Sequence, residues 1–206
     1  MSARDRILAR VRRAGADAPS PAPLRPAISR PAIPVEQFTA QAEAVQASVS
    51  RLAHIDNLPA AVADQLRQRN LPAAIRTGAD PLFDRDWGTV ERSQGPGRLA
   101  EPATLTRADL GVAETGSVVF ASGPDNPVTL NFLGETHFAV VAADAIVDGY
   151  EEAWAMLATR DRPRTTNFVT GPSRSGDIGQ TLQLGAHGPV ALHIFVIDDM
   201  GPGGAD

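Results

Sequence analysis

The sequence predicts an α/β protein with a mostly parallel sheet flanked by helices, preceded by an N-terminal helical arm. Short apolar runs alternate with amphipathic stretches from residue 35 onward, which is the pattern of layered α/β domains. Several runs are almost wholly apolar, as in a parallel sheet that is covered on both faces. The 206 residues, 43% of them hydrophobic and 21% charged, suffice for one core of an ordinary globular domain.

Residues 1–34 are expected to form the arm, and the folded body to begin near Val35. Ser2 can cap a short helix over residues 2–14, which carries a narrow apolar stripe of Ile7, Leu8 and Val11. This helix is too short and too polar to be stable alone, so it should dock on its own body, a sister subunit or another protein. Six prolines between residues 16 and 34 predict an extended linker.

The first part of the body is expected to hold two helices and a strand. Apolar residues recur at steps of four and three and predict one amphipathic helix. These residues are Phe38, Ala42, Val45, Val49 and Leu52. Residues 59–70 predict a second helix with Pro59 in its first turn, and "PAAIRTG" predicts a short strand before a glycine turn. Residues 79–103 favour no element, apart from a loop at "SQGPGR".

The pattern changes after residue 104. Buried strands are expected at "GSVVFAS", "THFAVVAA", "NFVT" and "ALHIFVIDD". Between the second and third of these, "DGYEEAWAMLATR" predicts a helix that Asp148 caps, with Glu151 and Glu152 favouring its positive end. Three of its residues should share one face, Tyr150, Trp154 and Leu157.

Composition excludes several classes of protein. A formal net charge of -5 and a pI of about 5.4 argue against a general nucleic-acid binder, which needs a basic face. The chain has no cysteine, so it offers neither disulfides nor thiolate ligands for an iron–sulfur cluster. No apolar run approaches membrane-spanning length, and the N-terminus lacks the apolar core of a signal peptide. We therefore expect a cytoplasmic protein.

Three polar loops beside predicted strands are candidate binding segments, because ligands gather at the carboxyl ends of strands in a parallel α/β sheet. The first loop follows "NFVT" and is rich in glycine, which lets backbone N–H groups surround an anion. It also carries polar side chains that can bind a carboxylate or phosphate. Its candidate residues are Gly171, Ser173, Arg174, Ser175 and Asp177. Asp177 either caps a helix begun by "DIGQTLQLG" or accepts a hydrogen bond from a ligand hydroxyl. The whole segment is alternatively a polar turn with a helix cap.

The second loop, "GAHGP", holds His187, which is either a proton-transfer group or a turn histidine bonded to a backbone carbonyl. In the third loop, "GVAETGSVVF", Glu114 should be partly desolvated and act as acid, base or nucleophile, or else bond the N–H groups of its own turn. Thr115, Gly116 and Ser117 are candidate ligand contacts. The three loops are expected to share one pocket. The four histidines show no metal-binding spacing, so no metal site is predicted.

Three segments, "AETGSVVF", "DAIVDGYEEAW" and "TGPSRSGDIGQTLQLGAHGPVALHIFVID", strongly resemble the LutC/YkgG family of lactate-utilisation proteins, which carry the LUD domain. The resemblance implies a fold like that of NagB, RpiA and CoA transferases, and a LUD domain over residues 35–206. It implies a role in oxidising L-lactate to pyruvate together with an iron–sulfur subunit and a cysteine-rich CCG-domain subunit, which would hold the clusters. By position, Glu114 is similar to the nucleophilic glutamate of CoA transferases of this fold.

Three functions follow from these observations. The first is a non-redox subunit of a lactate-oxidising complex that binds a small carboxylate or an organic cofactor. The second is a stand-alone transferase or ligase-type enzyme that acts on an acyl-CoA, phosphosugar or folate-like substrate through Glu114. The third is a regulatory or scaffold subunit that docks through the N-terminal arm. The sequence leaves the ligand and the oligomeric state open.

Overall fold

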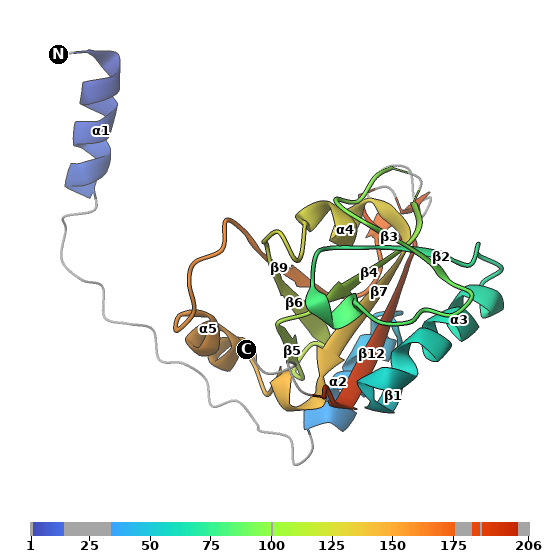
Figure 1. Ribbon diagram of the computed structural model, residues 1–206. Helices are drawn as coiled ribbons and strands as arrows, with labels where there is room; N and C mark the ends of the chain where they lie inside the picture. The colour runs from blue at the N-terminus through green and yellow to red at the C-terminus, as the bar shows by residue number, and fades with distance from the viewer. Residues whose placement is uncertain (1, 15–33, 100, 176–182, 186, 202–206) are drawn as a thin grey trace.

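Six parallel strands form the central sheet, in the order β1-β12-β7-β4-β2-β3 (Figure 1). The strands are β1 (Ser48–His54), β2 (Ala74–Thr77), β3 (Glu91–Gln94), β4 (Glu101–Arg107), β7 (Gly134–Ala142) and β12 (Ala191–Asp199). The computed structural model describes residues 2–14, 34–99, 101–175, 183–185 and 187–201. The predicted α/β class with a mostly parallel sheet is confirmed.

A second, smaller sheet lies against the first, in the order β8-β5-β6-β9. Its strands are β5 (Leu110–Val112), β6 (Ser117–Ala121), β8 (Ile146–Val147) and β9 (Thr166–Val169). β6 runs antiparallel to both β5 and β9. The runs "GSVVFAS" and "NFVT" are strands as expected, but they lie outside the parallel sheet. The β5–β6 connection is a tight turn, and such a turn joins only antiparallel neighbours.

Helices cover both sheets, so that the body consists of successive layers (Figure 1). The helices are α1 (Ala3–Ala14), α2 (Pro34–Ala44), α3 (Leu58–Gln68), α4 (Val128–Phe132) and α5 (Tyr150–Leu157), with short 3-10 turns at η1 (Ile55–Asn57), η2 (Pro81–Phe83) and η3 (Ala143–Ala145). Alternate residues of β7 face opposite layers, as strand geometry requires. Phe138 and Val140 pack with α3, whereas Ala139 and Val141 pack with α2 and the second sheet.

The first predicted helix is too long. α2 ends at Ala44, and Gln46 follows in the left-handed region with φ 68°. The N–H of Ala47 donates to the carbonyl of Ala42 at 3.0 Å, which closes the helix end. Residues 48–54 then form β1, where Val49 and Leu52 pack into opposite cores. Residues three apart lie on the same face of a helix but on opposite faces of a strand. The apolar spacing of Val49 and Leu52 therefore predicted a helix where the chain forms a strand.

Three smaller expectations also need correction. Asp148 does not cap α5: Gly149 holds the N-cap position, and the Asp148 N–H donates to Glu152 Oε2 at 3.1 Å. The stretch "DIGQTLQLG" does not begin a helix that reaches Leu184, because Gln183–Leu184 form β11 and pair with β10 (Arg174–Ser175). The loop predicted at "SQGPGR" begins only after Gln94, where β3 ends.

The other predicted elements are present where the sequence placed them. α1, α3, β2 and α5 occupy the expected stretches. Ser2 caps α1, since its Oγ accepts from the Asp5 N–H at 3.2 Å while the Ser2 N–H donates to Asp5 Oδ2 at 2.9 Å. Within the described part of the chain, none of the helices has the length and apolar character that crossing a bilayer requires.

Candidate functional site

Four hydroxyl groups from three segments of the chain meet on one side of the body, and we call them the hydroxyl cluster. Ser117, the first residue of β6, is fully buried. Its Oγ lies 2.7 Å from Thr115 Oγ1, 2.6 Å from Thr170 Oγ1 and 3.2 Å from the Tyr150 hydroxyl oxygen. Thr115 also donates to the Tyr150 hydroxyl at 3.3 Å. Two members, Thr115 and Ser117, are residues that the sequence predicted as ligand contacts.

Tyr150 is the titratable member of the hydroxyl cluster. Burial raises the pKa of Tyr150, but hydrogen bonds from Ser117, Thr115 and Thr170 together outweigh burial and lower that pKa below the ordinary value of a phenol. The carboxylate of Glu114 opposes the shift, which places its charge near the phenol. A hydroxyl network around such a phenol can donate to ligand oxygens and pass a proton.

Glu114 lies in the turn between β5 and β6, at the rim of the hydroxyl cluster. Its N–H donates to the carbonyl of Asp148 at 2.9 Å, which ties the turn to the start of α5. The side chain is exposed to solvent. The sequence argument assumed a partly desolvated carboxylate, so the role of Glu114 as acid, base or nucleophile stays a prediction that this exposure does not support.

Gly116 and Gly171 serve the packing of the site against α2. Both have a positive φ, +66° and +70°. A Cβ at Gly116 would overlap the backbone of Ala42, and a Cβ at Gly171 would overlap the carbonyl oxygen of Val45. Each turn therefore approaches the end of α2 more closely than any side chain allows. The predicted role of these two glycines as ligand contacts stays a prediction beside this packing role.

The other two glycine-rich loops contact each other, while the pocket that all three loops were expected to share stays a prediction. The Ser173 N–H donates to the carbonyl of Pro189 at 2.9 Å, and the His187 N–H donates to Ser173 Oγ at 3.4 Å. Arg174 Nε donates to Gln46 Oε1 at 2.6 Å, and its Nη1 donates to the carbonyl of Val190 at 2.9 Å. The Arg174 guanidinium thus holds this loop to the end of α2 and to the start of β12.

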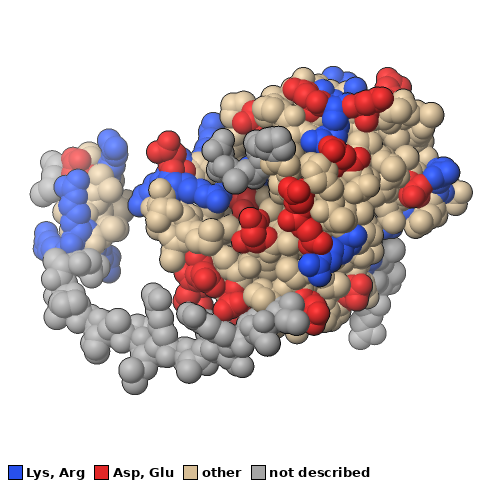
Figure 2. Space-filling view, turned by 60° about the horizontal axis from the view of Figure 1, so that its bottom comes forward, with Lys and Arg blue, Asp and Glu red and all other residues tan. Residues whose placement is uncertain are grey.

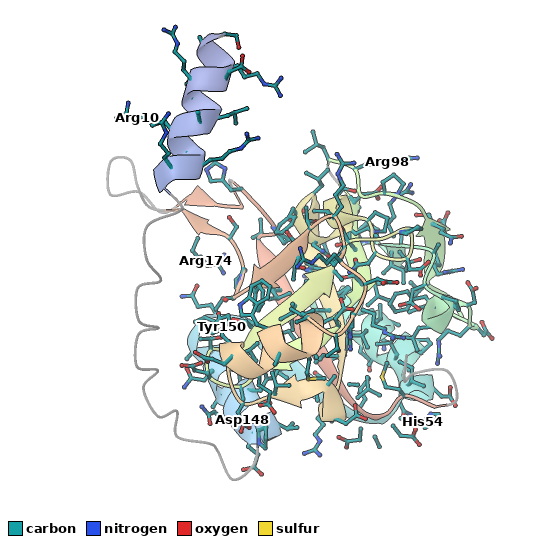
Figure 3. The ribbon with its side chains drawn as sticks, turned by 90° about the vertical axis from the view of Figure 1, so that its left-hand side faces the viewer. Arg10, His54, Arg98, Asp148, Tyr150 and Arg174 are labelled. Atoms are coloured by element: carbon teal, nitrogen blue, oxygen red, sulfur yellow. The ribbon has the colours of Figure 1, made fainter. Side chains whose placement is uncertain are left out.

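The remaining predicted residues of these loops are placed as follows. His187 is exposed, and Arg174 and Tyr150 lie on the same side of the body (Figure 3). Ser175 belongs to β10, opposite Gln183 of β11. Asp177 lies outside the described residues.

A cleft of about 480 Å³ lies at the carboxyl ends of β4, β7 and β12. Its polar lining consists of Arg107, Asp109, Asp144, Arg160, Asp198 and Asp199. Within it, Arg160 Nη1 donates to Asp109 Oδ1 at 3.1 Å. The position is where open parallel sheets hold ligands, and the volume is that of a small-molecule site. None of the predicted site residues that the structure describes lines this cleft.

The sequence contained signals for both unpredicted parts of the site. The signal for the cleft is "DD", Asp198 and Asp199, at the end of the strongest predicted strand. Thr170 is the last residue of "NFVT", and Tyr150 lies at the start of a predicted helix. Among the described side chains, no group of three or more histidine, cysteine or acidic residues is placed to hold a metal ion.

Two packed sheets with helices on their outer faces define the class of this molecule: a layered α/β protein whose main sheet is parallel. Residues 100–197 match the family model of the LUD domain. This segment resembles the LUD domain family, as the sequence motifs indicated.

Curated relatives share this segment of the chain. Lactate utilization protein C of Anoxybacillus flavithermus is 37% identical over 95 residues, which are 46% of this chain and 43% of the relative. The protein of the same name from Exiguobacterium sp. is 31% identical over 122 residues, 56% of this chain and 53% of the relative. In these two alignments the chain spans about half the length of the relatives. Lactate utilization protein C 1 of Bacillus mycoides is 26% identical over 186 residues, 80% of this chain and 79% of that protein.

A solved structure has the same fold. The crystal structure of a DUF162 family protein from Deinococcus radiodurans superposes with a TM-score of 0.62 at 21% identity. The match covers 80% of this chain and 96% of that one. The likeness supports the α/β architecture described above.

Proposed function

We propose that the chain is a non-redox subunit of a lactate-utilising system in the cytoplasm, and that it binds a small hydroxy- or oxo-carboxylate at the hydroxyl cluster. The relatives named Lactate utilization protein C support a role of this chain in lactate utilisation. The lack of cysteine supports the non-redox part, because the chain has no thiolate to ligate a cluster. Iron–sulfur and cysteine-rich CCG-domain proteins are the proposed partners that hold the clusters and accept the electrons.

The binding part of the proposal rests on the hydroxyl cluster. Its hydroxyl groups, drawn from three turns or strand ends and one helix start, converge with oxygen separations of 2.6 to 3.3 Å. Hydroxyls both donate and accept, so they match a ligand that carries a carboxylate and a neighbouring hydroxyl or keto oxygen. The lowered pKa of Tyr150 adds a group that exchanges protons with such a ligand.

The proposed domain boundaries place the LUD domain at residues 35–206 and the arm at residues 1–34. The family model begins at residue 100, but β1 pairs with β12 and completes the central sheet. α2 supports two turns of the candidate site through Gly116 and Gly171. Both observations support a domain that starts well before the matched segment.

The test is lactate-dependent dye reduction by reconstituted iron–sulfur and CCG-domain proteins, with and without this chain. Thr115→Val removes one hydroxyl of the cluster and keeps the side-chain shape. Thr39→Val is the matched control, because Thr39 Oγ1 only donates within α2 to the carbonyl of Val35 at 2.9 Å. Loss of one hydrogen bond to a carboxylate should raise the KM for lactate by about tenfold in the Thr115 variant and leave the control unchanged.

Two results contradict separate parts of this proposal. If the chain changes neither the rate nor the assembly of its partners, it is not a subunit of the system. If the chain is required but Thr115→Val behaves as the control does, the ligand does not bind at the hydroxyl cluster.

A further inference from the structure

The charge of the chain is divided unequally between arm and body. Residues 1–34 contain seven arginines and two aspartates, whereas residues 35–206 contain twelve arginines and 22 acidic residues. The arm is therefore cationic and the body strongly anionic. Surfaces of opposite potential attract one another and orient an encounter.

The helix of the arm presents an uncovered apolar stripe. Ile7 and Val11 are each 63% exposed and Leu8 is 39% exposed, and five arginines occupy the rest of the helix. In the described structure no part of the body covers this stripe. A helix of 12 residues is marginal alone in water, which calls for a packing surface on another molecule.

The cleft at the carboxyl edge of the sheet has the complementary chemistry. Its lining holds four aspartates against two arginines, Arg107 and Arg160, so the cleft carries a net negative charge. Asp109 is paired with Arg160 and Asp198 with Arg51 Nε at 2.8 Å, whereas the side chain of Asp144 is exposed. Its apolar lining includes Met156, which is 37% exposed, and Met200. Methionine side chains adapt readily to the shape of a partner helix. Figure 2 shows many acidic side chains on the face of the body that turns forward from the bottom of Figure 1, with arginines among them, and basic side chains on α1.

We propose that α1 of one copy docks on the carboxyl-edge cleft of a second copy, and that the exchange is reciprocal. Ile7 and Val11 would pack on the two methionines while the arginines of α1 face the aspartates. The acidic cleft is a feature of this chain, so a second copy offers it at equal concentration. Reciprocal docking closes a two-fold dimer, and the first contact makes the second intramolecular, at an effective concentration in the mM range.

The experiment is sedimentation analysis of the full chain over a range of concentrations. The chain should form a concentration-dependent dimer. Ile7→Asp with Val11→Asp disables the arm, and Asp144→Arg disables the cleft; each should weaken dimerisation by at least about tenfold. Glu135→Arg is the matched control, because Glu135 is exposed at the opposite end of β7 and makes the same change of charge.

Mixing the two disabled chains distinguishes exchange from other arrangements. Each disabled chain alone should dimerise at least about tenfold more weakly than the unaltered chain, but together they retain one intact arm and one intact cleft and should form a mixed dimer. Raising the salt concentration from about 0.05 M to about 0.5 M should weaken it, because the Debye length shortens. Circular dichroism shows whether each variant keeps the body folded. A monomer at every concentration, a dimer that survives loss of the arm, or a failure to complement on mixing would each overturn the proposal.

Discussion

Acidification from about pH 7 to about pH 5 should destabilise the body through two histidines that are buried on adjacent strands. His137 is fully buried on β7, and His193 is 2% exposed on β12. His137 Nε2 lies 2.7 Å from Thr106 Oγ1, and His193 Nδ1 lies 2.7 Å from Ser48 Oγ. The second ring nitrogen of each has no hydrogen-bond partner within the described structure. A proton added to either ring would therefore place an uncompensated charge in the core.

The magnitude follows from the pKa values. Burial lowers the pKa of both histidines from 6.5 to about 3, and for His193 the charge of Arg69 adds to the effect. Between about pH 6.5 and pH 3, both histidines are therefore protonated in the unfolded chain and neutral in the folded chain. This stability is present above pH 6.5 and is lost as pH falls from there toward about 3. At pH 5 the loss is about 2 kcal/mol per histidine, or about 4 kcal/mol together, out of the roughly 5–15 kcal/mol typical of a domain.

The assay is denaturant unfolding at closely spaced pH values between about 5 and 7. His193→Asn keeps a polar side chain near Ser48 but removes one titrating group, so it should remove about half of the acid-induced loss. The exposed His187 supplies the control: His187→Asn should keep the full loss, because that ring contacts water in the folded and the unfolded chain. A free energy of unfolding that does not change over this range, or a His193 variant with the full loss, would refute the reasoning.

Two further predictions concern the candidate site. Gly116→Ala should destabilise the body by about 3 kcal/mol or more, because the new methyl group overlaps the Ala42 backbone at a residue with positive φ. Gly88→Ala is the control, because Gly88 also has a positive φ, +57°, but has open space around it. This variant should lose only about 1 kcal/mol of unfolding free energy in the same denaturant assay. Ser117→Ala should raise the pKa of Tyr150, since it removes the largest hydrogen-bond contribution to the phenolate. The chain has one tyrosine, so ultraviolet titration of the phenolate reports this pKa directly, and an unchanged curve would show that Ser117 does not stabilise the phenolate.

Much of the fold could be predicted because burial leaves a direct mark on the sequence. β7 and β12 are buried on both faces, and their continuous apolar runs place them at the centre of the sheet. β1 could not be separated from α2 in the same way. Val49 and Leu52 suit a helical stripe and also suit the two faces of a strand, and only pairing with β12 decides between them. Strand pairing is a long-range property that local spacing does not contain.

The candidate site could be predicted in part, for a related reason. The rule that ligands lie at the carboxyl ends of parallel strands points to the cleft beside Asp198 and Asp199. The glycine-rich loops that the sequence favours lie instead around β6 and β9, whose sheet is mixed. Which strands are parallel depends on topology. The residue types that the chemistry needs can be read from the sequence, but their distribution over the hydroxyl cluster, the two contacting loops and the cleft depends on the tertiary fold.

Glycine-rich turns have two physical causes that the sequence cannot distinguish. A glycine lets a ligand approach the backbone, and it equally lets another backbone segment approach. At Gly116 and Gly171 the approaching segment is the end of α2, which therefore sets the position of Thr115, Ser117 and Thr170. A glycine needed only for ligand approach would lower affinity when substituted and leave stability intact. Substitution of either glycine beside the hydroxyl cluster should instead lower stability, because the new Cβ overlaps the end of α2. Any loss of ligand binding would follow from the loss of this support.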